Sequence, residues 1–130
     1  MRRPFAAILL VAADCPSSPG GIGEPQQCTL VGCMDGLSVR LPAAPAGAWR
    51  VQVTDVATGA TRTYDCPATS QCGSVAFFAE FTPARARVRV TTVGGSRDAD
   101  VQPAYAESRP NGPDCPPVCR QAAVEVPLPA

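Results

Sequence analysis

The sequence predicts an all-β fold made of two packed sheets, and three observations lead to this prediction. Within short stretches, apolar and polar residues alternate, which is the period of a strand with one buried face. Turn-forming residues interrupt these stretches, and the chain of 130 residues holds 11 Gly and 15 Pro. The third observation is a set of seven cysteines, which suits a small domain stapled by disulfides.

The expected strands begin mostly about 9 to 14 residues apart, the spacing of an all-β sandwich or barrel. Alternation is clear where Leu37, Val39 and Leu41 share one side and Ser38 and Arg40 share the other. The segments that we expect to form strands are 28–33, 37–41, 49–56, 61–65, 74–81, 87–93, 99–104 and 122–127. The apolar side chains that we expect in the core are Leu37, Val39, Leu41, Trp49, Val51, Val53, Val75, Phe77, Phe81, Val88, Val90, Val124 and Val126.

Three short segments carry turn chemistry. Asp35-Gly36 is a strong hairpin signal and lies between the first two expected strands. Segments 57–59 and 94–96 contain Gly and separate the third strand from the fourth and the sixth from the seventh. We therefore expect an immunoglobulin-like, Greek-key β-sandwich of about 7–8 short strands over residues 27–130.

The first residues have the pattern of an export signal. Arg2 and Arg3 precede an uncharged apolar run, 5–13, which is too short to span a bilayer. We expect residues 1–14 to be a secretory signal peptide. Residues 15–26 are rich in Pro, Gly and Ser and lack periodicity, so we expect them to form a flexible tether.

Two processing sites compete at the end of this signal. Residues 12–14 followed by Cys15 look like a bacterial lipobox, which predicts lipidation of Cys15 and anchoring to a membrane. Asp14 departs from that motif, because a small residue is expected before the cysteine. Cleavage before Asp14, with free secretion, is the alternative.

The remaining cysteines form an even set that we expect to be oxidised to disulfides after export. The set comprises Cys28, Cys33, Cys66, Cys72, Cys115 and Cys119. A zinc site built from the first two and the last two is the rival interpretation. Its C-x4-C and C-x3-C spacings do not match the usual C-x2-C pairs, so we expect no metal.

Geometry narrows the possible pairings. If 28–33 is extended, its ends lie about 16 Å apart at about 3.3 Å per residue, too far for one bridge. Pro116 and Pro117 favour an extended backbone after Cys115 as well. We therefore expect Cys28 and Cys33 to pair with Cys115 and Cys119, and Cys66 to close a local loop with Cys72.

Composition excludes several kinds of function. The formal net charge is zero, which removes the basic surface that nucleic-acid binding requires. The chain has no His, the commonest acid–base catalyst, and no Cys-x-x-Cys redox pair, so we expect no catalytic site and no cofactor.

Two charged clusters have competing interpretations. Arg85, Arg87 and Arg89 alternate and could form an anion-binding ladder, but we favour a solvated face paired with Glu80, Asp98 and Asp100. A calcium site at Asp98 and Asp100, with Asp35 or Asp55, lacks a recognisable loop spacing, and isolated surface carboxylates are the preferred interpretation.

The longest loop, 105–119, is the candidate binding surface because it is Pro-rich and its end carries two of the cysteines. Its contact-capable side chains are Tyr105, Glu107, Arg109 and Asn111. The alternative is a structural crossover held by prolines.

Segments 32–39 and 109–126 carry a resemblance to a known class of protein. In these two segments the chain resembles small bacterial exported proteins and lipoproteins that have a single disulfide-bearing immunoglobulin-like domain. A composition rich in residues with GC-rich codons and lacking Lys also indicates a bacterial source. The resemblance implies no established activity.

We expect a non-catalytic cell-envelope protein, on the periplasmic face or at the cell surface. It would bind an unidentified envelope protein or serve as a structural module. The alternative is a freely secreted inhibitor of hydrolases that uses loop 105–119.

Overall fold

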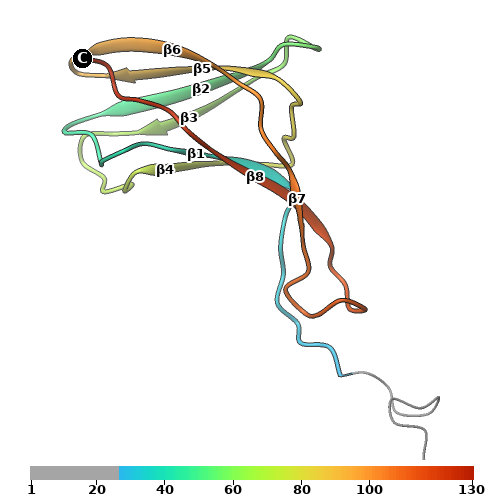
Figure 1. Cartoon of the computed structure of the whole chain (residues 1–130). Coiled ribbons are helices and arrows are strands. Elements are labelled where there is room, and N and C mark those ends of the chain that lie inside the picture. The colour runs from blue at the N-terminus through green and yellow to red at the C-terminus, as the bar shows by residue number, and fades with distance from the viewer. Residues whose placement is uncertain (1–26) are drawn as a thin grey trace, which may run out of the picture.

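The computed structural model describes residues 27–130, which form eight strands and no helix (Figure 1). The all-β prediction is therefore confirmed for this part of the chain. The expected signal peptide, Cys15 and the tether lie outside the described residues. The described part contains no helix with the length and apolar character needed to cross a membrane.

The strands form two sheets of four. The first sheet has the order β4-β1-β8-β7, with bounds Val75–Ala79, Gly36–Arg40, Cys119–Glu125 and Ala106–Ser108. The second sheet has the order β3-β2-β5-β6, with bounds Thr61–Cys66, Trp49–Asp55, Ala86–Thr92 and Gly95–Val101. Neighbouring strands are antiparallel except β1 and β8, which are parallel and pair from Gly36 with Gln121 to Arg40 with Glu125.

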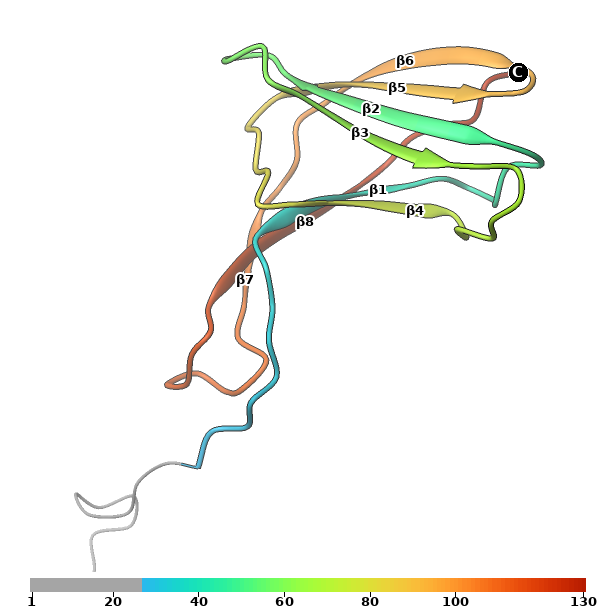
Figure 2. The same ribbon diagram turned by 180° about the vertical axis from the view of Figure 1, so that it is seen from behind.

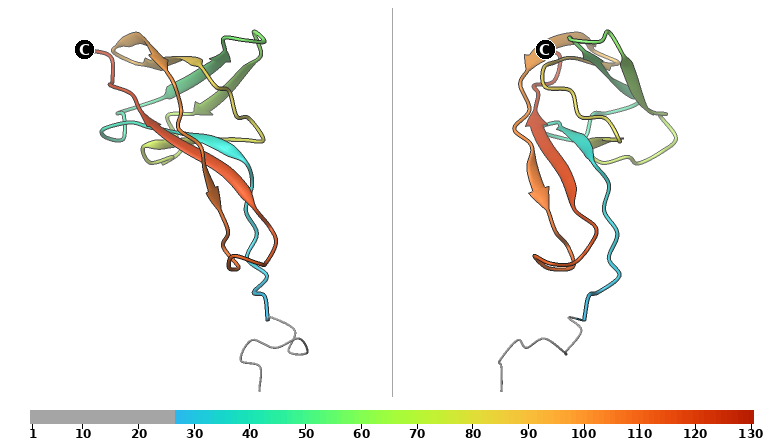
Figure 3. Two further views of the ribbon diagram at one scale, coloured as in Figure 1. Left: turned by 45° about the vertical axis from the view of Figure 1, so that its right-hand side comes forward. Right: turned by 90° about the vertical axis from the view of Figure 1, so that its right-hand side faces the viewer.

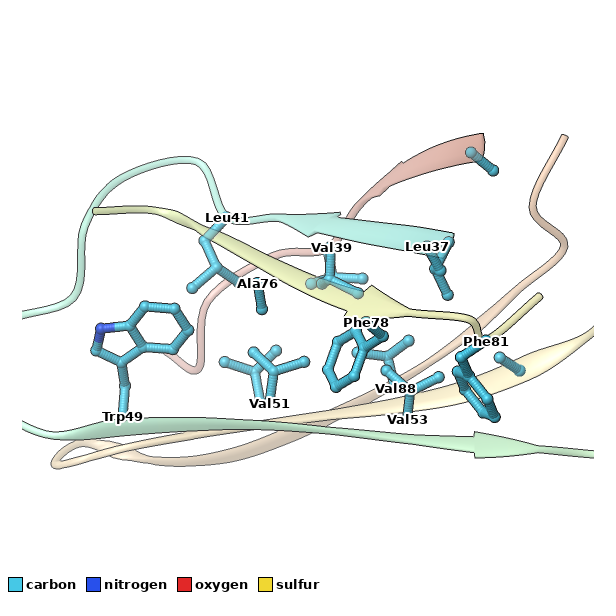
Figure 4. Packing of buried hydrophobic residues seen from close by; sticks show 14 of the residues in the cluster. Leu37, Val39, Leu41, Trp49, Val51, Val53, Ala76, Phe78, Phe81 and Val88 are labelled. Carbon is cyan, nitrogen blue, oxygen red and sulfur yellow. The ribbon is translucent and has the colours of Figure 1, made fainter. Parts of the chain in front are cut away.

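The core lies between the two sheets (Figure 4). Leu37 and Val39 of β1 face Val51 and Val53 of β2 and Val88 of β5, and all of these are completely buried. Their intervening residues point outward, so the alternation read from the sequence gives the correct inner face for these strands. Trp49, at the start of β2, is buried near one end of the core and packs against Tyr64, with the tilted rings 5.4 Å apart between centroids.

The predicted inner face of β4 is wrong. Val75 and Phe77 were expected in the core but are 43% and 38% exposed, whereas Ala76 and Phe78 are buried. The segment is apolar on both faces, so alternation does not distinguish them. Phe81 is buried as expected because Glu80, with a φ of 53°, breaks the alternation before it.

The beginning of the sandwich also differs from the prediction. Residues 28–33 form no strand, and Asp35-Gly36 makes no hairpin. Instead, the Asp35 carbonyl accepts a hydrogen bond from Glu80 N at 2.7 Å, and its carboxylate accepts one from Arg120 N at 2.7 Å. Asp35 thus joins the starts of the β1–β4 and β1–β8 ladders, because β1 has neighbours on both sides.

Two of the expected hairpins are present, β2–β3 and β5–β6. In the first, Gly59 N donates to the Asp55 carbonyl at 2.8 Å. Gly59 has a φ of 74°, which suits glycine. Strand β6 begins at Gly95, earlier than expected, because its residues are mostly polar and its apolar signal is confined to the end. Strand β7 was not expected at all, and its three residues lie in the predicted loop.

A close contact at Gly36 gives the first prediction. A Cβ at Gly36 would lie 2.5 Å from Phe77 Cζ and 2.6 Å from the Phe78 carbonyl oxygen, whereas one at Gly32 would meet nothing within 4 Å. We expect Gly36→Ala to lower the free energy of unfolding by about 1–3 kcal/mol through overpacking. Gly32→Ala should leave it nearly unchanged. Urea denaturation measures both, and equal midpoints for the two variants would contradict this account.

Candidate functional site

The candidate site is an arm that projects from the sandwich (Figures 1 and 3). We define the arm as residues 27–35 together with residues 105–119, which lie beside them in these views and contain β7. It includes all of the loop that the sequence singled out as a binding surface. It is also the part through which the chain enters the described structure.

Two disulfides hold the arm together. Cys28 is bonded to Cys115 and Cys33 to Cys119, with Cα–Cα distances of 5.7 and 6.1 Å. This is the expected cross-pairing, and the third expected bridge, Cys66–Cys72, is also present. These four cysteines of the arm are therefore disulfides, not zinc ligands. Three disulfides indicate an oxidising environment outside the cytoplasm.

The two arm bridges extend the parallel pairing of β1 and β8. Both join an earlier cysteine to a later one in the same order, so 28–33 and 115–119 run in the same direction. The two cysteines of each bridge are 87 and 86 residues apart in the sequence, which is close to the separation of Gly36 and Gln121, the first pair of the parallel ladder. Before the start of β1, disulfide bonds thus take the place of the backbone hydrogen bonds of the parallel ladder. The side-chain amide of Gln121 adds a bond to the Met34 carbonyl at 2.8 Å.

Asn111 bonds to residues that lie between the bridged cysteines on both sides of the arm. Its Oδ1 accepts hydrogen bonds from Val31 N at 2.9 Å and from the Thr29 hydroxyl at 2.5 Å. Its Nδ2 donates to the carbonyls of Val31 at 2.8 Å and Pro116 at 2.7 Å. An amide has two N–H donors and two acceptor sites on its oxygen, so all four are used. Towards Val31 the side chain acts as a strand would, giving and receiving one bond.

Arg109 and Glu107 shape the tip of the arm. Arg109 donates one bond to Glu107 Oε2 and another to the Pro113 carbonyl, both at 3.0 Å. Gly112, with a φ of 107°, closes a turn by donating to the Arg109 carbonyl at 3.1 Å. The two charged side chains stay largely exposed, so their ion pair contributes little to stability. Of the four predicted contact residues, these two face solvent.

Tyr105 connects the arm to the sandwich. Its hydroxyl donates to the Pro83 carbonyl at 2.8 Å, and the Arg120 guanidinium lies over its ring at 5.5 Å from the centroid. Desolvation by partial burial raises the pKa of Tyr105 to about 12. Tyr105 and Asn111 are therefore both engaged within the protein, whereas a role for the arm in binding a partner stays a prediction.

Several large apolar side chains of the arm are exposed to solvent. Leu30 is 99% exposed, and Val31, Met34 and Val118 are each about half exposed. Met34 and Val118 line one shallow depression where the arm meets the end of β4. Sequence reasoning did not single out these residues, because it placed Leu30 and Val31 in an expected strand, Met34 beside an expected turn and Val118 in the long loop.

The arginine cluster on the sandwich forms ion pairs. Arg89 is paired with Asp98 at 2.8 Å and Arg87 with Asp100 at 3.2 Å, on the outer face of β5 and β6. The hydrogen bond from Arg89 lowers the pKa of Asp98. This is the solvated, paired face that we favoured for Asp98 and Asp100, whereas Arg85 lies before β5 and Glu80 follows β4 of the other sheet. Among residues 27–130, no group of three or more potential ligands is placed to hold a metal.

Comparison with known proteins adds no relative. No protein-family model matches the chain, and no curated protein or solved structure is significantly similar to it.

The two arm bridges give the second prediction, because they close nearly the same loop. With Cys33–Cys119 intact, Cys28–Cys115 closes only a short ring made of 28–33 and 115–119. By chain entropy, removing either bridge alone should cost about 3 kcal/mol, but removing both should cost about 7 kcal/mol. Paired Cys→Ser variants, compared by urea denaturation, measure these losses. A double loss no larger than the sum of the two single losses would contradict the nested-loop account.

The pKa of Tyr105 gives the third prediction. The unfolded chain loses this phenol proton near pH 10.0, whereas the folded protein holds it to about 12. The folded state thus binds more protons between these values, so stability that is present below pH 10 falls as the pH rises towards 12.

Tyr105→Phe tests this dependence. At about pH 8 it should be less stable by about 1 kcal/mol through loss of the bond to Pro83. Between about pH 8 and 11 its urea midpoint should fall less than that of the wild type. Parallel pH curves for the two proteins would contradict the assignment.

Proposed function

We propose that this protein is a non-catalytic module of the bacterial cell envelope, anchored by lipid on Cys15 and presenting its sandwich to an envelope protein or assembly. The observation that carries the proposal is the arm. The described chain enters through a segment that two disulfides bind to the last hairpin. Tension applied through the tether would pass into covalent bonds before it reached the hydrogen bonds of β1.

The oxidising environment indicated by the disulfides supports export, and the pattern of residues 1–15 supports processing at Cys15. The exposed apolar side chains of the arm support contact with another protein.

We also propose that the fold is a variant of the immunoglobulin-like Greek key. The order β3-β2-β5-β6 corresponds to strands C′, C, F and G, and the β4–β1 pair corresponds to E and B. Trp49 is buried on β2, where immunoglobulin domains carry a core tryptophan. The departure is β8, which occupies the place of strand A but runs parallel to β1.

The lipid anchor gives the fourth prediction. The chain is expressed in a bacterial host with its own first residues, and its intact mass is measured before and after reduction. We expect a mature chain that begins at Cys15, carries diacylglycerol, and gains six hydrogens on reduction because three disulfides open. An unlipidated chain that begins at Asp14 would overturn the anchoring.

A cysteine variant provides the control. Cys15→Ser should move the protein from the membrane fraction to the soluble fraction. The variant that lacks Cys66 and Cys72 should stay with the membrane, because it retains the lipid site and the arm.

The freely secreted inhibitor is the second candidate. It is favoured by the bracing of loop 105–119 through two disulfides and Asn111, because a rigid loop loses little entropy on binding. An inhibitor would block one or more members of a panel of purified hydrolases at equimolar concentration, whereas an anchored module would leave them all active.

A further inference from the structure

Strand β4 lies at an edge of the first sheet and pairs only with β1 (Figure 2). Its residues, Val75–Ala79, have the sequence VAFFA. Within residues 27–130, no other strand adds to the ladder at this margin of the sandwich. The other side of β4 therefore offers a free strand edge.

The hydrogen bonds that flank the β1–β4 ladder show which backbone groups face this free edge. Leu41 N donates to the Ser74 carbonyl at 2.8 Å, and Glu80 N donates to the Asp35 carbonyl at 2.7 Å. In an antiparallel ladder, alternate residues bond the same neighbour. The backbone N–H and C=O groups that point towards β1 are thus those of residues 74, 76, 78 and 80. The backbone groups of Val75, Phe77 and Ala79 point away from β1.

The other edge strands of the two sheets carry charges that discourage pairing. Strand β3 contains Arg62 and Asp65, β6 contains Asp98 among other charges, and β7 contains Glu107. Charged side chains on an edge strand oppose the addition of a further strand. Strand β4 has none, and its exposed side chains, Val75 and Phe77, are apolar.

We propose that β4 pairs antiparallel with β4 of a second copy of this chain, which joins the first sheets of two molecules into one continuous sheet. The three outward-facing residues are symmetric about Phe77, so a two-fold axis beside Phe77 places Phe77 opposite Phe77 and Val75 opposite Ala79. Each N–H and C=O that is free at this edge then finds a partner. This proposal is independent of the proposed function and of the arm.

The side chains fit the same symmetric pair. Phe77 and Val75 lie on the outer face and are 38% and 43% exposed, so pairing covers apolar surface that is now in contact with water. No charge meets a like charge, because Glu80 would lie opposite Ser74. The φ of 53° at Glu80 turns the chain away from the strand direction and limits the pairing to this short segment.

The first test is the molar mass of the full chain, with its disulfides formed, up to about 1 mM, since one strand pair buries a small area and binds weakly. We expect the mass to rise towards that of a dimer. Val75→Lys should weaken dimerisation at least tenfold because it places a charge on the edge. Val93→Lys is the matched control, because Val93 is 78% exposed in the β5–β6 turn, and it should dimerise like the wild type.

The second test is residue-specific cross-linking with an added mild oxidant. Directly opposed residues in a hydrogen-bonded antiparallel pair have Cα atoms about 5.5 Å apart, within reach of a disulfide. Phe77→Cys should therefore form a reducible covalent dimer. Val75→Cys should not, because the two copies of residue 75 would lie about 14 Å apart at about 3.4 Å per residue. The unsubstituted chain, treated with the same oxidant, is the control for any covalent dimer formed through Cys15.

The outcomes separate this pairing from other associations. A dimer that Val75→Lys weakens and that Phe77→Cys alone captures supports the proposal. A wild type that stays monomeric at about 1 mM overturns it. Three other results also overturn it: a dimer that Val75→Lys does not weaken, equal cross-linking of both cysteine variants, and growth beyond the dimer. Each of these requires another surface or another register.

Discussion

The parallel pairing of β1 with β8 is the constraint on which the rest of the structure depends. It brings together two segments that are separated by most of the chain, and loop-closure entropy opposes such a contact. The two arm disulfides hold the same alignment beyond the sheet, so the covalent and the hydrogen-bonded parts reinforce each other. With β1 and β8 fixed, β4 and β7 take the outer positions of the first sheet, and the second sheet covers its inner face.

Polar groups have little share in the core but organise its boundaries. Among residues 27–130, no polar or charged side chain is buried, and no buried side-chain nitrogen or oxygen lacks a partner. The ion pairs on the second sheet are exposed and contribute little, so the apolar core and the disulfides stabilise the fold. Asp35 and Asn111 act differently, because each joins segments that are distant in sequence.

Local patterns in the sequence predicted what local physics decides. Alternation identified the inner faces of β1, β2 and β5, and the reach of a disulfide was enough to select the bridge pattern. The inner face of β4 could not be predicted in this way, because Val75 and Phe77 are as apolar as Ala76 and Phe78. The Phe77 ring lies where a Cβ at Gly36 would be, so the outer position of Phe77 depends on a glycine in the neighbouring strand. Asp35 and Asn111 were misjudged because the partners that tie them to distant segments, Arg120 for Asp35 and Val31 for Asn111, lie 85 and 80 residues away in the sequence.

The arrangement of the first sheet separates two requirements that compete in a small exported domain. In the anchored protein that we propose, the sandwich needs one end that resists tension, and its uncharged β4 edge needs space for the proposed second copy. The sheet order puts β7, which belongs to the arm, at one edge and β4 at the other. A second copy added at β4 would therefore leave both arms accessible, because β4 and β7 lie at opposite edges of the first sheet. The proposed transfer of tension and the proposed self-association would thus depend on opposite edges of one sheet.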